Sequence, residues 1–218
     1  MPAQTFETDY VILRKTPFQD SSLIVSGISS GFGRLDFLLK GARAVSRRRF
    51  PEAELFREFH VIFREAKSAE GLSSMVSCDP AGRHDGIAEK PDHYVSACAY
   101  ASFLLRNTKP MLAVPDTYRA FSVLLSRLER EPESEPWISL AKFVFLYENG
   151  FVPQNGDGGS EAEEASGLSA SIRKLMTLAL DPEHVLPPDV KGFWRRFRVW
   201  IDNLSSWNGL EKTSAQRS

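Results

Sequence analysis

The chain has 218 residues, of which 42% are hydrophobic, and its formal net charge is −1. This length and apolar content allow one large domain or two small ones with a real core. No apolar run approaches the roughly 18 residues of a membrane span, and the opening MPAQTFETDY lacks the pattern of a secretion signal. We therefore expect a folded cytoplasmic protein that has no membrane partner.

Residues that could carry catalysis or bind metal are few and scattered. Cys78 and Cys98 lie far apart, and neither belongs to a CxxC pair, so we expect neither a disulfide scaffold nor a zinc site. The four histidines are His60, His84, His93 and His184. No phosphate-cradling glycine motif accompanies them. We therefore expect no enzyme, no cofactor and no small-molecule substrate.

The first eighty residues predict five short strands. The runs are rich in β-branched and aromatic residues or alternate between apolar and polar, and they span residues 9–15, 21–29, 33–40, 54–64 and 71–78. In the fifth run we expect Leu72, Val76 and Cys78 on one face and Met75 on the other. Five short strands with a basic loop after the third favour a small closed barrel of the OB-fold type over residues 1–80.

A dense cationic segment follows the third strand. Gly41 ends the strand, and the basic residues that come next, without any acid among them, are Arg43, Arg47, Arg48 and Arg49. Between residues 10 and 50 there are eight Lys and Arg against two Asp, whereas residues 131–165 carry eight acids against Lys142 alone. Crowded guanidinium groups repel one another unless an anion neutralises them. The segment therefore either binds a nucleic-acid backbone or is a solvated, mobile loop.

After Pro91 the apolar period becomes helical, which predicts an all-α domain over residues 81–218. We expect the second helix to be capped by Asp116 and the third, over residues 135–149, to stop at Gly150. Two further helices are expected at residues 169–180 and 191–207. The segment 154–167 is rich in Gly and Glu without an apolar period, and we expect it to be a mobile loop.

The last helix allows two interpretations. Phe193, Phe197 and Trp200 repeat at helical spacing, while Arg195, Arg198 and Asp202 fall mostly off that stripe. A core-facing aromatic stripe with a solvated basic face is the structural interpretation. In the functional interpretation, Arg195, Arg196 and Arg198 extend the cationic surface toward phosphates.

The order of short motifs resembles the N-terminal OB domain of the bacterial recombination mediator RecO family. The matching motifs are Leu13-Arg14, Asp20-Ser21-Ser22, Gly31-Phe32-Gly33-Arg34 and Lys40-Gly41-Ala42-Arg43, followed further on by Leu146-Tyr147-Glu148-Asn149-Gly150-Phe151-Val152-Pro153. The resemblance covers roughly residues 9–153 and is strongest in the first fifty.

This resemblance implies binding of single- and double-stranded DNA, annealing of complementary strands, and help in loading a recombinase during DNA repair. The implied partners are RecR and the acidic C-terminal tail of the single-stranded-DNA-binding protein, and the implied location is the nucleoid. The implied DNA-backbone contacts are Arg34, Lys40, Arg43, Arg47, Arg48 and Arg49. Many relatives place a zinc-binding cysteine cluster after the Gly-aromatic turn, but residues 154–167 contain neither Cys nor His, so we expect no metal. The alternative is an OB-fold scaffold that binds protein without binding DNA.

Overall fold

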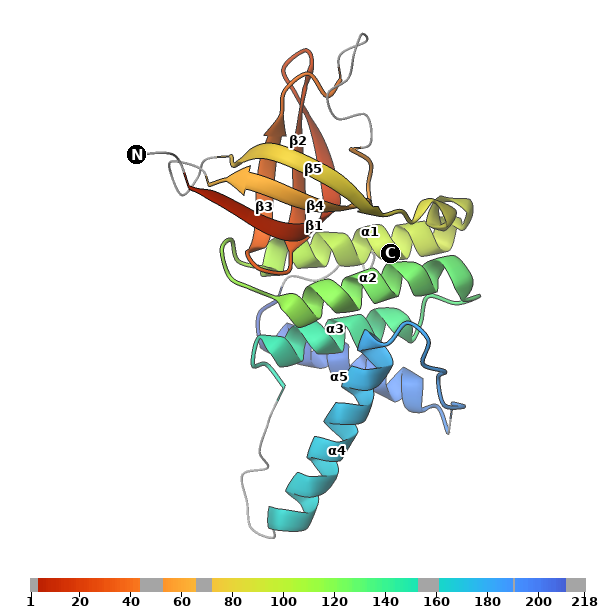
Figure 1. The fold of residues 1–218 in the computed structure, drawn as a ribbon. Coiled ribbons are helices and arrows are strands. Elements are labelled where there is room, and N and C mark those ends of the chain that lie inside the picture. The colour runs from red at the N-terminus through yellow and green to blue at the C-terminus, as the bar shows by residue number, and fades with distance from the viewer. Residues whose placement is uncertain (1–3, 44–52, 66–71, 153–160, 190, 211–218) are drawn as a thin grey trace.

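A five-stranded antiparallel sheet packs on a group of helices (Figure 1). The computed structural model describes residues 4–43, 53–65, 72–152, 161–189 and 191–210, without the side chains of residues 161–168. The strands are β1 (Thr5–Phe18), β2 (Ser22–Ser29), β3 (Gly33–Leu39), β4 (Glu58–Arg64) and β5 (Ser74–Gly82). The helices are the 3-10 turn η1 (Asp85–Glu89), α1 (Pro91–Asn107), α2 (Pro115–Arg130), α3 (Trp137–Glu148), α4 (Glu161–Leu180) and α5 (Phe193–Trp207).

The long central strand β1 gives the sheet its curvature. The strand order is β3-β2-β1-β4-β5, and β1 pairs with β4 from Thr5 to Val11 and with β2 from Tyr10 to Phe18. A bulge between Ile12 and Arg14 shifts the register with β2. Because a bulge bends a strand and increases its twist, the sheet coils around an interior.

The expected closed barrel is only partly formed. A single parallel bridge joins Phe37 to Ser73, where the Ser73 amide donates to the Asp36 carbonyl over 3.0 Å. No ladder continues from that bridge within the described residues, because β5 pairs with β4 alone. The sheet is therefore OB-like but not closed, and the prediction of an α+β protein with N-terminal strands and C-terminal helices is confirmed.

Each face of the sheet is apolar and packs against a different core. Tyr10, Phe37 and Phe63 are fully buried in the interior around which the sheet coils, which we call the inside of the curl. The apolar-polar alternation of the strands predicted such a buried face. On the other face, Val11 and Ile28 belong to the same buried cluster as the helices. The strands and the helices therefore share one continuous apolar interface, and their packing fixes the sheet on the helices.

The predicted alternation of inward and outward residues was wrong for the fifth strand. Val76 is 41% exposed, whereas Met75 and Cys78 pack against the core inside the curl. The β4–β5 register shifts between Ile62 and Phe63, and such a bulge changes which residues of the partner strand face inward. A strict alternation from residue 71 could not anticipate that shift.

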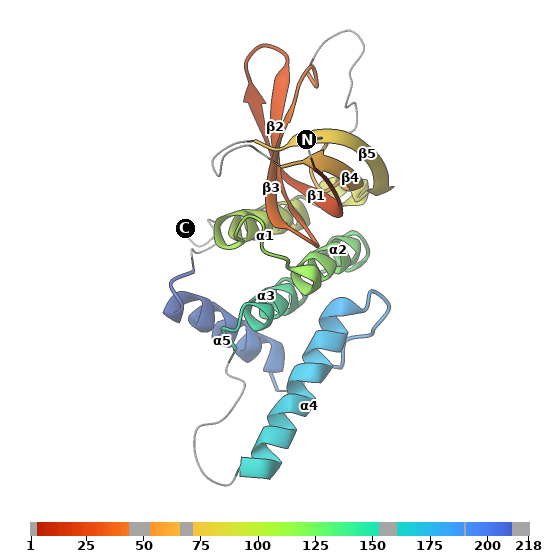
Figure 2. The same ribbon diagram turned by 60° about the vertical axis from the view of Figure 1, so that its left-hand side comes forward.

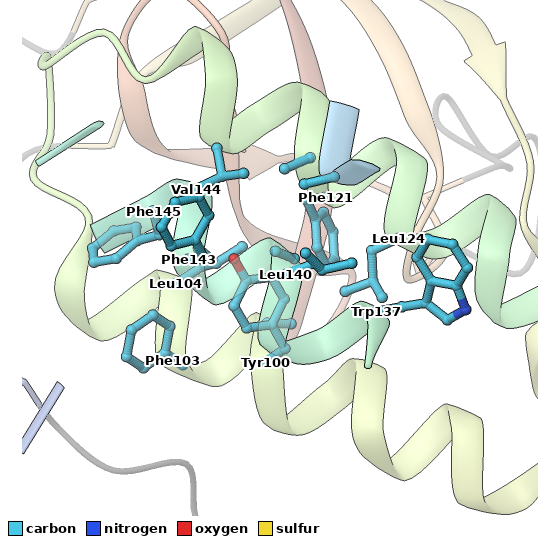
Figure 3. Close-up of a cluster of buried hydrophobic side chains, with 14 of the residues drawn as sticks. Tyr100, Phe103, Leu104, Phe121, Leu124, Trp137, Leu140, Phe143, Val144 and Phe145 are labelled. Atoms are coloured by element: carbon cyan, nitrogen blue, oxygen red, sulfur yellow. The ribbon is translucent and has the colours of Figure 1, made fainter. Parts of the chain in front are cut away.

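The helical core is built mainly by α1, α2 and α3 (Figure 3). Tyr100 of α1, Phe121 of α2 and Phe143 of α3 are fully buried, and the Tyr100 and Phe121 ring centroids lie 5.8 Å apart. The aromatic spacing that predicted these helices therefore marks their packed faces. Gly150 adopts the predicted left-handed conformation after α3, with φ of 74°.

Two predictions at helix starts were wrong. Asp116 lies inside the first turn of α2 and makes no side-chain cap; instead, the Glu148 carboxylate accepts from the Asp116 and Thr117 amides over 2.9 and 2.8 Å. A carboxylate from α3 thus accepts the hydrogen bonds of two free backbone amides at the N-terminus of α2. The helix α4 already begins at Glu161, so residues 161–167 are not the expected loop. Its opening Glu and Ala residues are good helix formers, and acidic residues favour a helix N-terminus.

Candidate nucleic-acid interface

The exposed cations predicted to bind DNA lie at the end of the sheet that points away from the helices. The opposite end of β3 is fixed to the helical part, because Gly33 bridges to Pro110 and the Arg34 amide donates to the Lys109 carbonyl. The strand leaves that contact and ends at Leu39, in the part of the sheet farthest from the helices (Figure 1). We call the exposed residues Lys40 and Arg43, which follow it, the distal cations.

Contacts with the β1–β2 turn hold Arg43, one of the distal cations, in place. The Arg43 amide donates to the Ser21 carbonyl over 2.8 Å, and Arg43 Nη1 donates to the Gln19 carbonyl over 3.4 Å. Gly41 between them has φ of 73°, a conformation that glycine adopts without strain. Arg43 is thus fixed through its backbone while its side chain stays exposed.

The densest cationic run, Arg47, Arg48 and Arg49, lies outside the described residues. The chain around it is defined on both sides, by exposed Arg43 and by Ala53, which is 8% exposed. The run is therefore connected to the distal cations through a few residues of sequence. Phe50 follows the run directly and could stack on a base, but it also lies outside the described part of the chain.

Arg34 occupies a different environment from the distal cations. Its Nε lies 3.1 Å from Asp36 Oδ2, and its Nη1 donates to the Leu105 carbonyl of α1 over 3.1 Å. The side chain is 31% exposed. At about 3.3 Å per strand residue, Arg34 and Lys40 are separated by roughly 20 Å. This guanidinium joins β3 to α1, and the structure does not bring it together with Lys40 and Arg43.

Arg195 and Arg196 form a third, separate group. Both are exposed on α5, which packs beside α3 on the side of the helices away from the sheet (Figure 2). Arg196 Nη1 donates to the Lys191 carbonyl. The same helix buries Phe197 and Ile201, so a solvated basic face does accompany a core-facing stripe. The five predicted contacts that lie in the described part of the chain therefore divide among three places, and the distal cations are the ones nearest in sequence to the Arg47–Arg49 run.

Phe32, an aromatic residue in the turn before β3 that could stack on a base, packs within the sheet. Its ring meets Phe6 and Phe63 edge to face, with centroid distances of 5.4 and 5.3 Å. The Phe32 ring therefore packs against the core inside the sheet.

An apolar groove between α4 and α5 was not anticipated from the sequence. Its volume is about 680 Å³, and its lining residues are Ser171, Lys174, Leu175, Leu178, Pro187, Pro188, Phe193, Trp194, Arg196, Phe197 and Trp200. Phe193 and Trp200 remain 42% and 38% exposed. No lining residue is acidic, and Lys174 and Arg196 contribute positive charge. The aromatic stripe of the last helix was the available sequence signal, since part of it faces this groove rather than the core.

A buried histidine links the sheet to the helices. His84 Nε2 lies 3.5 Å from Glu58 Oε1 of β4, and His84 Nδ1 lies 3.3 Å from Glu129 Oε2 of α2. Burial lowers the pKa of His84, but the two carboxylates outweigh burial and raise it above the ordinary value. Burial also opposes ionisation of Glu58, yet its contacts with His84 and Ser122 hold that pKa below the ordinary value. This cluster stabilises the junction between the two parts.

The described residues form neither a metal-ligand cluster nor a membrane-spanning helix. Among the described residues, no group of three or more His, Cys, Asp and Glu side chains is placed to hold a metal ion. None of the helices in the described segments is long and apolar enough to cross a membrane.

Comparison with known families agrees with this geometry. Residues 1–83, which include all five strands, match the family model described as recombination protein O N terminal. No curated protein matches the chain at a significant level. Residues 1–83 are therefore similar to the N-terminal domain of recombination protein O.

Proposed function

We propose that this protein is a DNA-binding recombination mediator that anneals complementary strands and assists recombinase loading during repair. The observation that carries the proposal is a RecO-type domain whose sheet ends in exposed cations leading into the Arg47–Arg49 run. Phosphates attract such cations regardless of base sequence, because binding releases counterions from the nucleic acid. Single- and double-stranded DNA are therefore both expected ligands.

Annealing requires no bond chemistry in this proposal. Two strands that are held on one cationic surface repel each other less and meet at a higher effective concentration. Base pairing then completes the reaction. We place this activity in the cytoplasm, at the nucleoid.

The experiment that tests this proposal is an annealing assay with a triple variant. Arg47→Ala/Arg48→Ala/Arg49→Ala should lower the annealing rate of complementary oligonucleotides and weaken the binding of each strand alone. A melting curve checks that the variant is folded. Unchanged annealing and strand binding by the folded variant would reject this cationic run as the DNA site.

The groove between α4 and α5 supports the protein partners of this proposal. An acidic peptide with an apolar side chain would place that side chain among Phe193, Trp194 and Trp200 and its charges near Lys174 and Arg196. The C-terminal tail of the single-stranded-DNA-binding protein is the partner of this kind that the family resemblance implies. RecR is the second implied partner and is included in the proposal.

A labelled tail peptide tests the groove separately from DNA. Lys174→Glu/Arg196→Glu should abolish binding of an acidic tail peptide in fluorescence anisotropy, because both charges are reversed. Arg173→Glu/Arg130→Glu reverses two charges on α4 and α2 at residues that do not line the groove and should bind as the wild type does. Equal peptide affinity for the two variants would show that the tail does not bind in this groove.

The same groove also favours the second candidate function, a scaffold that binds protein but not DNA. The two candidates differ in the effect of Arg47→Ala/Arg48→Ala/Arg49→Ala. A scaffold keeps its protein partner and shows no strand binding even before substitution, whereas a mediator loses strand affinity on substitution and still binds the peptide.

A further inference from the structure

A cavity at the junction of the sheet and α1 gathers cations from three parts of the chain. Its volume is about 610 Å³, and its lining residues are Leu13, Arg14, Lys15, Arg34, Leu55, Cys98, Ser102, Leu105 and Arg106. Four of these nine residues are cationic and none is acidic. We call this space the junction cavity.

Two of the cations pair with carboxylates of neighbouring residues, and a third contacts a neutral group. Lys15 pairs with Glu54, and Arg34 pairs with Asp36. Arg14 Nη2 contacts a neutral partner, the Ser26 hydroxyl, at 3.4 Å. An anion entering the cavity would therefore meet Arg14 without displacing a carboxylate from it.

Arg34 presents an ordered guanidinium to the cavity. Asp36 and the Leu105 carbonyl hold its Nε and Nη1, and its Nη2 makes no hydrogen bond to any other described residue. A guanidinium whose orientation is already fixed loses little side-chain entropy when it donates to an oxyanion.

The remaining walls fit the uncharged part of a nucleotide. Leu13, Leu55 and Leu105 provide apolar surface beside the cations. The Ser102 hydroxyl donates to the Cys98 carbonyl over 2.9 Å, which leaves its oxygen able to accept a hydrogen bond. Apolar walls with convergent polar groups are typical of a site for a small organic group carrying charge.

We propose that the junction cavity binds one nucleotide of a DNA strand, with its phosphate at Arg14, Arg34 and Arg106 and its base or sugar against the leucines. This inference rests on the proposed function and adds a specific subsite to it. Lys15 lies four residues before Gln19, whose carbonyl accepts from Arg43, so β1 connects the cavity to the distal cations.

The test compares two double variants in oligonucleotide binding. Arg14→Gln/Arg106→Gln removes two cavity charges and leaves the Arg34–Asp36 pair in place. Arg130→Gln/Arg173→Gln is the matched control, because these two arginines do not line the cavity. We expect the cavity variant to bind a labelled single strand about tenfold more weakly and its log-log salt slope to fall by about 0.7, because the arginines of the cavity neutralise one phosphate. Circular dichroism melts confirm that both variants fold.

A second measurement identifies the source of the nucleotide. In a Cys78→Ser background, Cys98 reports occupancy through its reaction rate with methyl methanethiosulfonate. A saturating oligonucleotide should slow that reaction at least several-fold, whereas adenosine monophosphate at the same nucleotide concentration should slow it less. Protection by the mononucleotide but not by the strand would overturn the strand as the ligand.

Different experimental results would reject the nucleotide site in the junction cavity and the proposed DNA-binding function. If the wild-type chain binds DNA and Arg14→Gln/Arg106→Gln binds it equally, with the same salt slope, the junction cavity is excluded and the function stands. If the wild-type chain binds no strand and neither probe slows the Cys98 reaction, both are overturned.

Discussion

Both ends of β3 carry basic residues, but these residues differ in burial and in their partners. Arg34, at the inner end, is half-buried, paired with Asp36 and bonded to the Leu105 carbonyl. Lys40 and Arg43, past the outer end, are exposed. Neighbouring carboxylates and carbonyls, rather than residue type, therefore decide which cations are held within the fold and which are exposed. The predictions below separate the two ends.

The largest expected contrast concerns the two glycines at these ends. Both have positive φ, but a Cβ at Gly33 would lie 2.3 Å from the Leu112 carbonyl oxygen and 2.5 Å from that of Lys109, whereas a Cβ at Gly41 has nothing within 4 Å. Gly33→Ala should lower the free energy of unfolding by about 3 kcal/mol or more, and Gly41→Ala by about 1 kcal/mol. Urea titration measures both. Equal losses would mean that the inner end is not fixed against the segment after α1.

The second contrast concerns arginines at the two ends. Arg34→Gln should cost about 1–2 kcal/mol of unfolding free energy, because it removes charge-assisted hydrogen bonds in a half-buried site and leaves the Asp36 carboxylate without its partner. Arg43→Gln, at an exposed position, should stay within about 0.5 kcal/mol of the wild type. The same titration checks both variants, and a loss for Arg43→Gln as large as that for Arg34→Gln would contradict the assignment.

The smallest expected effect is the pH dependence of the inner junction. Since the folded pKa of His84 is raised, its contribution is complete below the unfolded value near 6.5 and is lost as pH rises through the folded pKa. Since the folded pKa of Glu58 is lowered, its contribution is present above about 4.5 and is lost as pH falls through the folded pKa. The cluster is thus most stabilising between these two limits.

Replacing the histidine tests this dependence. His84→Gln should flatten the fall in melting temperature on the alkaline side, while His184→Gln, which removes an exposed histidine that lies after α4, serves as the control. Melting curves from pH 5 to pH 9 compare the two with the wild type. An unchanged alkaline fall in His84→Gln would show that the dependence has another origin.

Local patterns predicted the elements, and long-range contacts determined their roles. Alternation in residues 33–40 predicted the buried faces of Leu35, Phe37 and Leu39 because the two-residue period of a strand is local. The pairing of Arg34 with Leu105 spans 71 residues, and no period connects the two. The Glu148 cap of α2 and the junction cavity likewise join segments that meet only in the folded chain.

The errors have similar physical causes. The Gly and Glu content of residues 154–167 favoured a loop, although Glu and Ala also propagate a helix once it starts, and α4 begins at Glu161. The barrel prediction counted five strands correctly, but closure depends on how β3 and β5 diverge, which strand number does not determine.

The central claim is that the outer end of the sheet neutralises phosphates. The most direct measurement is the salt dependence of single-strand binding for the wild type and for a variant with Lys40, Arg43, Arg47, Arg48 and Arg49 all replaced by Gln. The wild-type log-log slope should be about 3.5 units steeper than that of the variant, at about 0.7 per neutralised phosphate. Parallel measurement of Arg195→Gln/Arg196→Gln shows whether α5 adds to the slope. Equal slopes for the wild type and the five-residue variant, with both chains folded, would contradict the account.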